Sequence, residues 1–303
     1  MWEDKASWLF GVVVSPHALS CFDLLIWLRT GQAAAARLAT SQSSVSRKVS
    51  DVARAFGVQP RKSDGEWLLE GDPTLLNLER QVHQRFRWER GLPLRIEAQY
   101  YSGPLFCQGL SDYWIRGNFD FLEVGTPLRH LRDGVIDAWI ATYPDLPADD
   151  DPDFSCFHLI RYPLGLAAPE GHPLLALGGS IRLQDVDPYP TVALDDGAYP
   201  KVQAALEALN LWNRSLQRGT RVSLQMTAAS LGDPLALSPA SLFNCHLLPG
   251  SWRLLPLKLG LVSGDSLIVR REYASHPRLA PLLAHLRQTA MQLAERHGEV
   301  ELA

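Results

Sequence analysis

The apolar positions near the start of the chain follow helical spacing. Four of them, each three or four residues from a neighbour, predict a helix with one apolar face: Leu19, Phe22, Leu25 and Ile26. Gly31 stands where a residue of positive φ is expected to end this helix. Residues 32–39 are rich in alanine and predict a short second helix, across which a third helix can pack closely.

Residues 42–56 predict the most informative helix of the chain. Its apolar side chains fall within a narrow stripe at 100° per residue: Val45, Val49, Val52 and Phe56. Short hydroxyls and two arginines fall on the opposite side: Ser43, Ser46, Arg47, Ser50 and Arg54. Short side chains permit close approach to the floor of a DNA groove, and guanidinium groups bind guanine or phosphate. An ordinary exposed helix of a three-helix core fits the same pattern.

Residues 58–71 predict a β-hairpin beside that helix. Ser63-Asp64-Gly65 is a tight-turn signal between a basic segment and a short apolar strand. On this interpretation Arg61 and Lys62 face backbone phosphates as part of a wing. The alternative is a plain hairpin that carries two surface cations.

Asp72-Pro73 predicts the start of a further helix, with Asp72 at the cap and Pro73 in the first turn. Apolar side chains form a seam along it: Leu75, Leu78, Val82 and Phe86. A lone helix with such a seam needs a partner, most simply a second copy of itself. The seam therefore predicts a dimer that places two reading helices on neighbouring major grooves.

From about residue 94 the pattern alternates strands with helical stretches, which predicts an α/β arrangement with mainly parallel sheets. The strands are expected at 94–100, 119–124, 136–142, 157–167, 191–194, 220–223, 235–238 and 266–270.

The distribution of charge supports a nucleic-acid partner for the first part of the chain. The 303 residues carry a net charge of −4, which argues against DNA binding if taken as one number. Residues 37–62, however, hold six basic residues and one acidic residue. Affinity for phosphate depends on such a local patch, so the positive charge lies where a DNA-reading element needs it.

The segment Ser41-Gln42-Ser43-Ser44-Val45-Ser46-Arg47 resembles the recognition segment of LysR-type transcriptional regulators, which reads Ser-Gln-Pro-x-x-Ser-x-x-Ile. Further matches follow in the family's order at 133–140, 169–174, 181–186 and 235–239. Ser43 replaces the family's usual proline, and the helix after the wing is shorter than the family norm.

This resemblance implies an α/β protein overall, with four parts. They are an N-terminal extension (1–17), a winged helix-turn-helix (18–71), a linker or dimerisation helix (72–91) and a periplasmic-binding-protein-like effector domain (92–303). The effector domain is expected to have two subdomains, one of about 92–167 with 263–303 and the other of about 168–262. Crossover strands near 163–168 and 260–266 are expected to join them.

The expected DNA contacts divide into two groups. Base contacts are expected from Gln42, Ser43, Ser46 and Arg47, and contacts nearer the backbone from Ser50, Arg54, Arg61 and Lys62. Effector contacts are expected at strand ends and helix starts, where unpaired N–H groups favour an anion. The candidates are Ser102, Gly103, Thr126, Thr142, Asp195, Asp196 and Tyr199. Each could equally be a plain cap, and Asp195 and Asp196 suit a cationic or hydroxylated ligand better than a carboxylate.

Motifs of other classes are missing from the sequence. It has no GxSxG, P-loop, GxGxxG or HExxH pattern, so we expect no enzyme, no cofactor and no metal. The apolar run at 8–14 is too short for a signal peptide or a membrane span, which favours a cytoplasmic protein.

The expected function is a transcriptional regulator that binds double-stranded DNA as a homodimer or homotetramer and responds to a small-molecule effector. RNA polymerase is left open as a further partner. The alternatives are a small-molecule-binding protein and a degenerate regulator without effector response.

Overall fold

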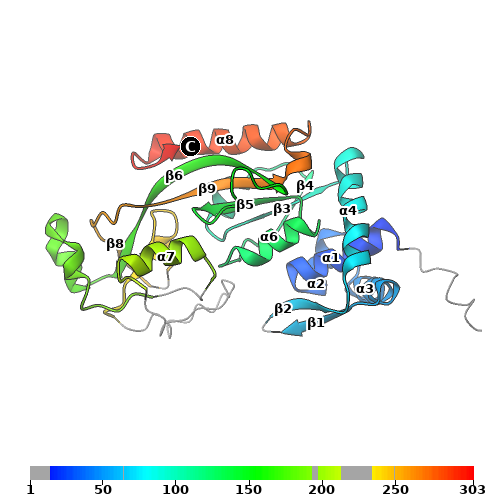
Figure 1. Ribbon diagram of the computed structural model, residues 1–303, viewed down its shortest axis with the longest axis horizontal. Coiled ribbons are helices and arrows are strands. Elements are labelled where there is room, and N and C mark those ends of the chain that lie inside the picture. The colour runs from blue at the N-terminus through cyan, green and yellow to red at the C-terminus, as the bar shows by residue number, and fades with distance from the viewer. Residues whose placement is uncertain (1–13, 64, 193–196, 213–233, 249) are drawn as a thin grey trace, which may run out of the picture. The chain divides into compact units, whose positions relative to one another are not determined.

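The computed structural model describes residues 14–63, 65–192, 197–212, 234–248 and 250–303 (Figure 1). The chain separates into two compact units. Unit 1 comprises the residues up to Arg95 with the segments Asp112–Gly117 and His130–Asp137. Unit 2 comprises Ile96–Ser111, Asn118–Arg129 and the residues from Ala138 onward.

Unit 1 contains a winged helix-turn-helix, as the sequence predicts. Three helices, α1 (Pro16–Leu28), α2 (Gly31–Arg37) and α3 (Gln42–Phe56), are followed by the antiparallel hairpin of β1 (Gln59–Ser63) and β2 (Glu66–Glu70). The long helix α4 (Thr74–Glu89) comes next, and the short strand β4 (Trp114–Arg116) also belongs to this unit.

Helix α3 has the expected bounds because both of its ends are capped. The Ser41 hydroxyl accepts a hydrogen bond from the Ser44 amide at 3.2 Å, and Gly57 takes a left-handed conformation at φ 65°. Val45, Val49 and Val52 are buried and Phe56 is half-buried, so the apolar stripe lies on the core side.

The prediction that Gly31 ends the first helix is wrong. Helix α1 ends at Leu28 with Arg29 in the left-handed conformation, and Gly31 is the first residue of α2. A glycine is favoured here because a Cβ would lie 3.2 Å from Cγ of Gln42. Its small size, rather than its backbone freedom, explains the position.

The start of α4 also differs from the prediction. Pro73, not Asp72, is the cap residue, and Thr74 begins the helix. The Asp72 carboxylate lies one residue further out and accepts hydrogen bonds from the amide and the hydroxyl of Thr74. It therefore still satisfies a backbone donor of the first turn.

Unit 2 is built on a mixed sheet. Strands β3 (Leu94–Ala98) and β5 (Ala138–Tyr143) are parallel, whereas β9 (Leu261–Arg270), β6 (Phe154–Pro169) and β10 (Glu301–Leu302) continue the sheet with antiparallel pairings. The expected mainly parallel sheets are therefore wrong. The long strands β6 and β9 run in opposite directions along each other, and this pairing makes most of the sheet antiparallel.

Strand β6 takes part in two groups of strands. Its residues up to Leu164 pair with β9, and Gly165–Pro169 pair with the short strands β7 (Ser238–Ala240) and β8 (Trp252–Leu254). It thus pairs with two different sets of strands along its length, and the change falls within the region 163–168 where a crossover strand is expected.

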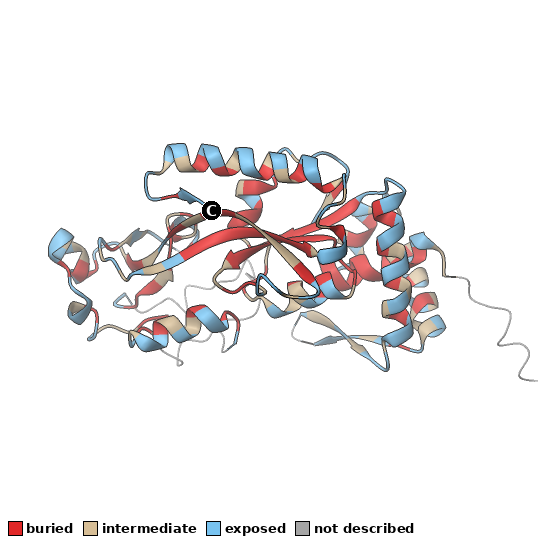
Figure 2. Ribbon diagram, turned by 45° about the horizontal axis from the view of Figure 1, so that its top comes forward, coloured by how far each residue is buried: buried red, intermediate tan, exposed pale blue. Residues whose placement is uncertain are grey.

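Helices complete both halves of unit 2. They are α5 (Ser102–Phe106), α6 (Gly125–Arg132), α7 (Pro200–Ala208) and α8 (Leu279–Arg296). The residues of α6 from His130 onward belong to unit 1. A 3-10 segment with a kink at Gly178 lies at Pro173–Ser180. Single 3-10 turns lie at Leu183–Asp185, Cys245–Leu247 and Arg271–Tyr273. Helix α8 buries one side, with Leu282, Leu286 and Leu293, and leaves the other exposed (Figure 2).

Within the described residues, two expected strands are represented only by isolated bridges. Residues 119–124 contribute the bridge between Phe121 and Gln99, and Phe119 takes a positive φ of 53° at the start of this segment. Thr191 likewise makes one bridge to Leu237. The expected strand at 220–223 lies outside the described residues.

Candidate functional site

All the side chains expected to read DNA are exposed. Six of them share the outer face of α3: Gln42, Ser43, Ser46, Arg47, Ser50 and Arg54. The Ser50 hydroxyl donates to the Ser46 carbonyl at 3.1 Å, and Arg54 lies 3.5 Å from the Asp51 carboxylate. Within the described part of the chain Arg47 has no ion pair, so its guanidinium is available to an external partner.

The wing holds its two cations on strand β1. Arg61 donates to Glu70 of the paired strand at 2.9 Å, and the Lys62 ammonium lies 5.9 Å from the centre of the Trp67 ring. The Trp67 indole N–H donates to the Arg29 carbonyl at 3.0 Å. This bond fixes the hairpin to the end of α1, so the wing and the three-helix core form one piece.

The seam of α4 is exposed within its unit. Leu75, Leu78, Val82 and Phe86 retain 65%, 54%, 63% and 44% of their surface. The opposite side of the same helix is buried through Leu76, Arg80, Gln84, Arg87 and Trp88. An apolar row of this length on a helix that is already packed on its other side is typical of an interaction surface.

Buried ion pairs hold α4 in unit 1. Asp23 of α1 accepts from Arg80 at 2.8 Å and from Arg95 at 3.2 Å. Asp137 accepts from Arg87 of α4 at 2.9 Å. Desolvation of the buried Arg95 guanidinium is the largest cause that lowers its pKa to about 10. These pairs fix α4 to both α1 and the segment that precedes β5.

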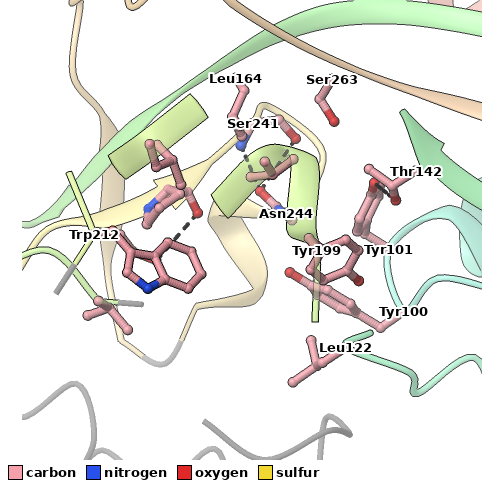
Figure 3. A pocket seen from close by; sticks show the side chains of 15 residues that line it. Tyr100, Tyr101, Leu122, Thr142, Leu164, Tyr199, Trp212, Ser241, Asn244 and Ser263 are labelled. Carbon is pink, nitrogen blue, oxygen red and sulfur yellow. Dashed lines mark hydrogen bonds between the residues drawn. The ribbon is translucent and has the colours of Figure 1, made fainter. Parts of the chain in front are cut away.

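Unit 2 contains a cavity of about 80 Å³ lined by fifteen side chains (Figure 3). Aromatic rings from four positions dominate it, and we call it the aromatic cavity: Tyr100, Tyr101, Tyr199 and Trp212. Tyr100 and Tyr101 stand edge to face with ring centres 5.2 Å apart. A wider and more open groove of about 630 Å³ runs along β6, β9 and residues 254–262, and it lacks these rings.

Two of the expected effector residues line the aromatic cavity, namely Thr142 and Tyr199. The Thr142 hydroxyl is hydrogen-bonded to the Tyr101 hydroxyl at 2.6 Å, and the Tyr199 hydroxyl donates to Gln99 at 2.8 Å. Burial is the main cause that raises the pKa of the Tyr101 and Tyr199 hydroxyls. Both phenols are therefore neutral.

Three expected effector residues do not line the cavity. Ser102 is fully buried and donates to Asp265 of β9, and a Cβ at Gly103 would overlap the ring of Phe119. Thr126 is half-buried at the start of α6, where its amide donates to the carboxylate of Glu123 at 3.0 Å. Asp195 and Asp196 lie outside the described residues.

The main contributors that sequence reasoning missed are Tyr100, Tyr101, Trp212 and Asn244. The pair Tyr100-Tyr101 directly follows β3, and two consecutive aromatics after a buried strand are a usable signal. No local pattern marks Trp212 or Asn244. Their place depends on how residues distant in the sequence meet, which a single sequence does not reveal.

The described residues contain no cluster of three or more His, Cys, Asp or Glu side chains that could hold a metal ion. Across the same part of the chain, no helix is long and apolar enough to cross a membrane.

A winged reading head and an α/β unit with a ligand-sized cavity define the class of ligand-responsive transcriptional regulators. The model of the LysR substrate-binding domain matches residues 118–291, which is more than half of the chain. The chain therefore belongs to the LysR family of transcriptional regulators.

Solved structures share this fold along most of the chain. A full-length OxyR variant from Pseudomonas aeruginosa matches with a TM-score of 0.53 and 20% identity, over 91% of this chain and 97% of that one. A probable transcriptional regulator from the same organism matches with a TM-score of 0.55 and 14% identity, over 90% of this chain and 96% of that one. CbnR, a LysR family transcriptional regulator, matches with a TM-score of 0.50 and 17% identity, over 91% of this chain and 99% of that one. No curated protein matches the chain by sequence.

Proposed function

We propose that this regulator reads DNA through the outer face of α3 and supports that contact with its wing. The supporting observation is the exposed row of short polar side chains around Arg47, opposite a face of buried valines. Gln42, Ser43, Ser46 and Arg47 contact base edges, because they lie in the first turns of the helix that enters the major groove. Ser50, Arg54, Arg61 and Lys62 contact the phosphate backbone.

The protein acts as a homodimer or a larger homo-oligomer built from it. The seam of Leu75, Leu78, Val82 and Phe86 has spacings of three and four residues, which is the spacing of a paired helical seam. Pairing of two copies along α4 buries this row and provides two reading heads for an inverted repeat. Since DNA is the partner, we place the protein in the cytoplasm.

The aromatic cavity takes a small-molecule effector. It lies in unit 2 beside the crossover strand β6, through Leu164, and the two halves of the unit contribute to its wall. A ligand that binds one arrangement of these halves better than another shifts the population between them. The alternatives to this role are a degenerate regulator without effector response and a small-molecule-binding protein that does not read DNA.

DNA binding tests the proposal. The purified protein is titrated with DNA from upstream of its own gene, over a salt series and with scrambled competitor. Binding should be selective and should weaken steeply with salt, because phosphate contacts release counterions. Arg47→Ala should cost about 1–3 kcal/mol on the preferred sequence and relax discrimination at one position.

Arg287→Ala provides the matched control. It removes one exposed arginine from α8, far along the chain from α3, and should leave DNA binding unchanged. Equal losses in both variants would indicate a general charge effect. A folded oligomer without selective binding at any salt concentration would favour the alternatives.

A further inference from the structure

The aromatic cavity presents no charged side chain to a ligand. Among the described residues that line it are tyrosines, a tryptophan, serines, a threonine, an asparagine and aliphatic groups, but no Lys, Arg, His, Asp or Glu. Figure 3 shows Trp212 across the cavity from Tyr100, Tyr101 and Tyr199. A wall of rings favours a planar apolar partner, since aromatic pairs gain energy beyond the area they bury.

Several hydrogen-bonding groups of this wall already have partners within the chain. The hydroxyls of Tyr101 and Tyr199 are bonded to Thr142 and Gln99. The Asn244 carbonyl oxygen accepts from the Ser241 amide at 2.7 Å. The Trp212 indole N–H is buried and has no hydrogen-bond partner among the described residues. Within the described part of the chain, the wall therefore offers a ligand a neutral donor but no cation to pair with an anionic group.

Helix starts near the cavity are occupied by the chain's own carboxylates. At α7, Asp145 accepts from the amides of Lys201 and Val202 at 2.7 and 3.1 Å. At α6, both oxygens of Glu123 accept from the Thr126 amide. Backbone N–H groups that would otherwise attract a ligand anion are thus satisfied internally.

At the start of α5, the carboxylate is that of Asp265, which is the most buried of the three. Asp265 is fully buried in β9, and it accepts from the Ser102 hydroxyl at the start of α5 and from the Tyr162 hydroxyl. Tyr101 and Ser263, which lie next to these groups, line the cavity. An anion in the cavity would stand near a buried negative charge, where repulsion is weakly screened.

We propose that the effector of this regulator is an uncharged planar molecule of about one aromatic ring, and that the cavity rejects the carboxylate analogue. The proposal rests on the proposed effector role of the cavity. Its volume of about 80 Å³ favours a small ligand. The ring wall sets the shape, and the internal carboxylates exclude negative charge.

Three molecules of nearly equal shape test the charge directly: benzamide (neutral), benzoate (anion) and benzamidine (cation). Each is titrated into the full-length protein, and binding is followed by ligand-observed NMR. Benzamide should bind at least about tenfold more tightly than benzoate, because the internal carboxylates repel the anion. It should also bind more tightly than benzamidine, because no described side chain of the wall can pair with the amidinium group as it loses its hydration. Stronger binding of benzoate or benzamidine overturns the ligand class, and so does the failure of all three to bind.

Two variants and one control variant test where benzamide binds and why benzoate is rejected. Trp212→Ala should weaken benzamide about tenfold. Trp252→Ala removes a half-buried tryptophan of the same unit outside the cavity and should leave benzamide binding unchanged. Asp265→Asn removes the buried charge with little change in shape and should improve benzoate relative to benzamide at least about threefold. An unchanged ratio would refute the electrostatic argument.

DNA binding separates this inference from the proposed function. If no probe binds while selective DNA binding still disappears in Arg47→Ala, the ligand class is wrong and the DNA-reading role stands. If the probes bind as expected and DNA does not, the cavity argument stands and the reading head must be reconsidered.

Discussion

Two buried aspartates are stabilised in opposite ways. Asp23 faces the guanidinium groups of Arg80 and Arg95, whereas Asp265 accepts its hydrogen bonds from the hydroxyls of Ser102 and Tyr162. Desolvation is the largest cause that raises the pKa of Asp265, to about 6, and the two hydroxyls and Arg161 only partly oppose it. The buried charge of Asp23 is therefore paired with two guanidinium groups, whereas the desolvation of the Asp265 charge is only partly offset by its hydrogen bonds.

Asp265 predicts a pH-dependent difference in stability. Its pKa in the folded state, about 6, exceeds the value of about 4 in an unfolded chain. Its contribution to stability is thus complete below pH 4 and is lost as the pH rises through 6. Asp265→Asn should gain up to about 2 kcal/mol relative to the wild type between pH 4 and pH 7.

Urea unfolding of both proteins from pH 4 to pH 8 measures this difference. Asp150→Asn, which changes an exposed loop carboxylate, should show a difference that does not vary with pH. A flat profile for Asp265→Asn would mean that the folded protein does not bind a proton more tightly at this position.

Replacement of Asp23 should destabilise the protein, whereas replacement of Asp265 should stabilise it. Asp23→Asn removes the carboxylate that Arg80 and Arg95 share and should lower the free energy of unfolding by about 3–5 kcal/mol. Asp51→Asn breaks an exposed pair with Arg54 and should cost less than about 1 kcal/mol. Thermal and urea unfolding compare the two, and similar small losses would show that the buried pair contributes little.

Helix α4 serves two surfaces at once. Its buried side carries Arg80 and Arg87, which form ion pairs inside unit 1. Its exposed side carries the apolar seam. Since the buried side is already satisfied, the seam can be changed without removing the contacts that hold the helix in place.

Disruption of the seam should therefore separate the copies and leave each one folded. Val82→Glu places a charge in the middle of the row and should raise the dissociation constant of the dimer about tenfold or more. Gln81→Glu adds the same charge beside the row and should have little effect. Sedimentation over a range of concentrations measures both, and an unchanged dimer in Val82→Glu would place the interface elsewhere.

Elements with strong local signals could be predicted from the sequence, and elements set by distant contacts could not. Helix α3 was predictable because Ser41, the valine stripe and Gly57 agree. The strand expected at 119–124 consists of a single bridge at Phe121, and the positive φ of Phe119 at its start is one that its residue type does not favour. For the site, the polar face of α3 could be proposed from spacing alone, whereas Trp212 joins the cavity only through tertiary structure.

At the scale of the whole molecule, the two units are linked at more than one point of the chain. The segments 112–117 and 130–137 belong to unit 1, so the chain passes from one unit to the other repeatedly. One such passage joins Asp137, which pairs with Arg87 of α4, directly to β5, whose Thr142 lines the cavity. The chain from Asp137 to β5, together with the Asp137–Arg87 ion pair, thus connects the cavity wall to the helix that carries the seam.

The bond from Trp67 to the Arg29 carbonyl has a consequence for the DNA rather than for the protein. It ties the wing to the end of α1, so it helps to set the spacing between Lys62 and the recognition face of α3 in the protein without DNA. The less such a head can adapt to the double helix, the more the double helix must bend or narrow its groove. That deformation is easier for some base steps than for others. Base pairs that no side chain touches should therefore contribute to the choice of operator.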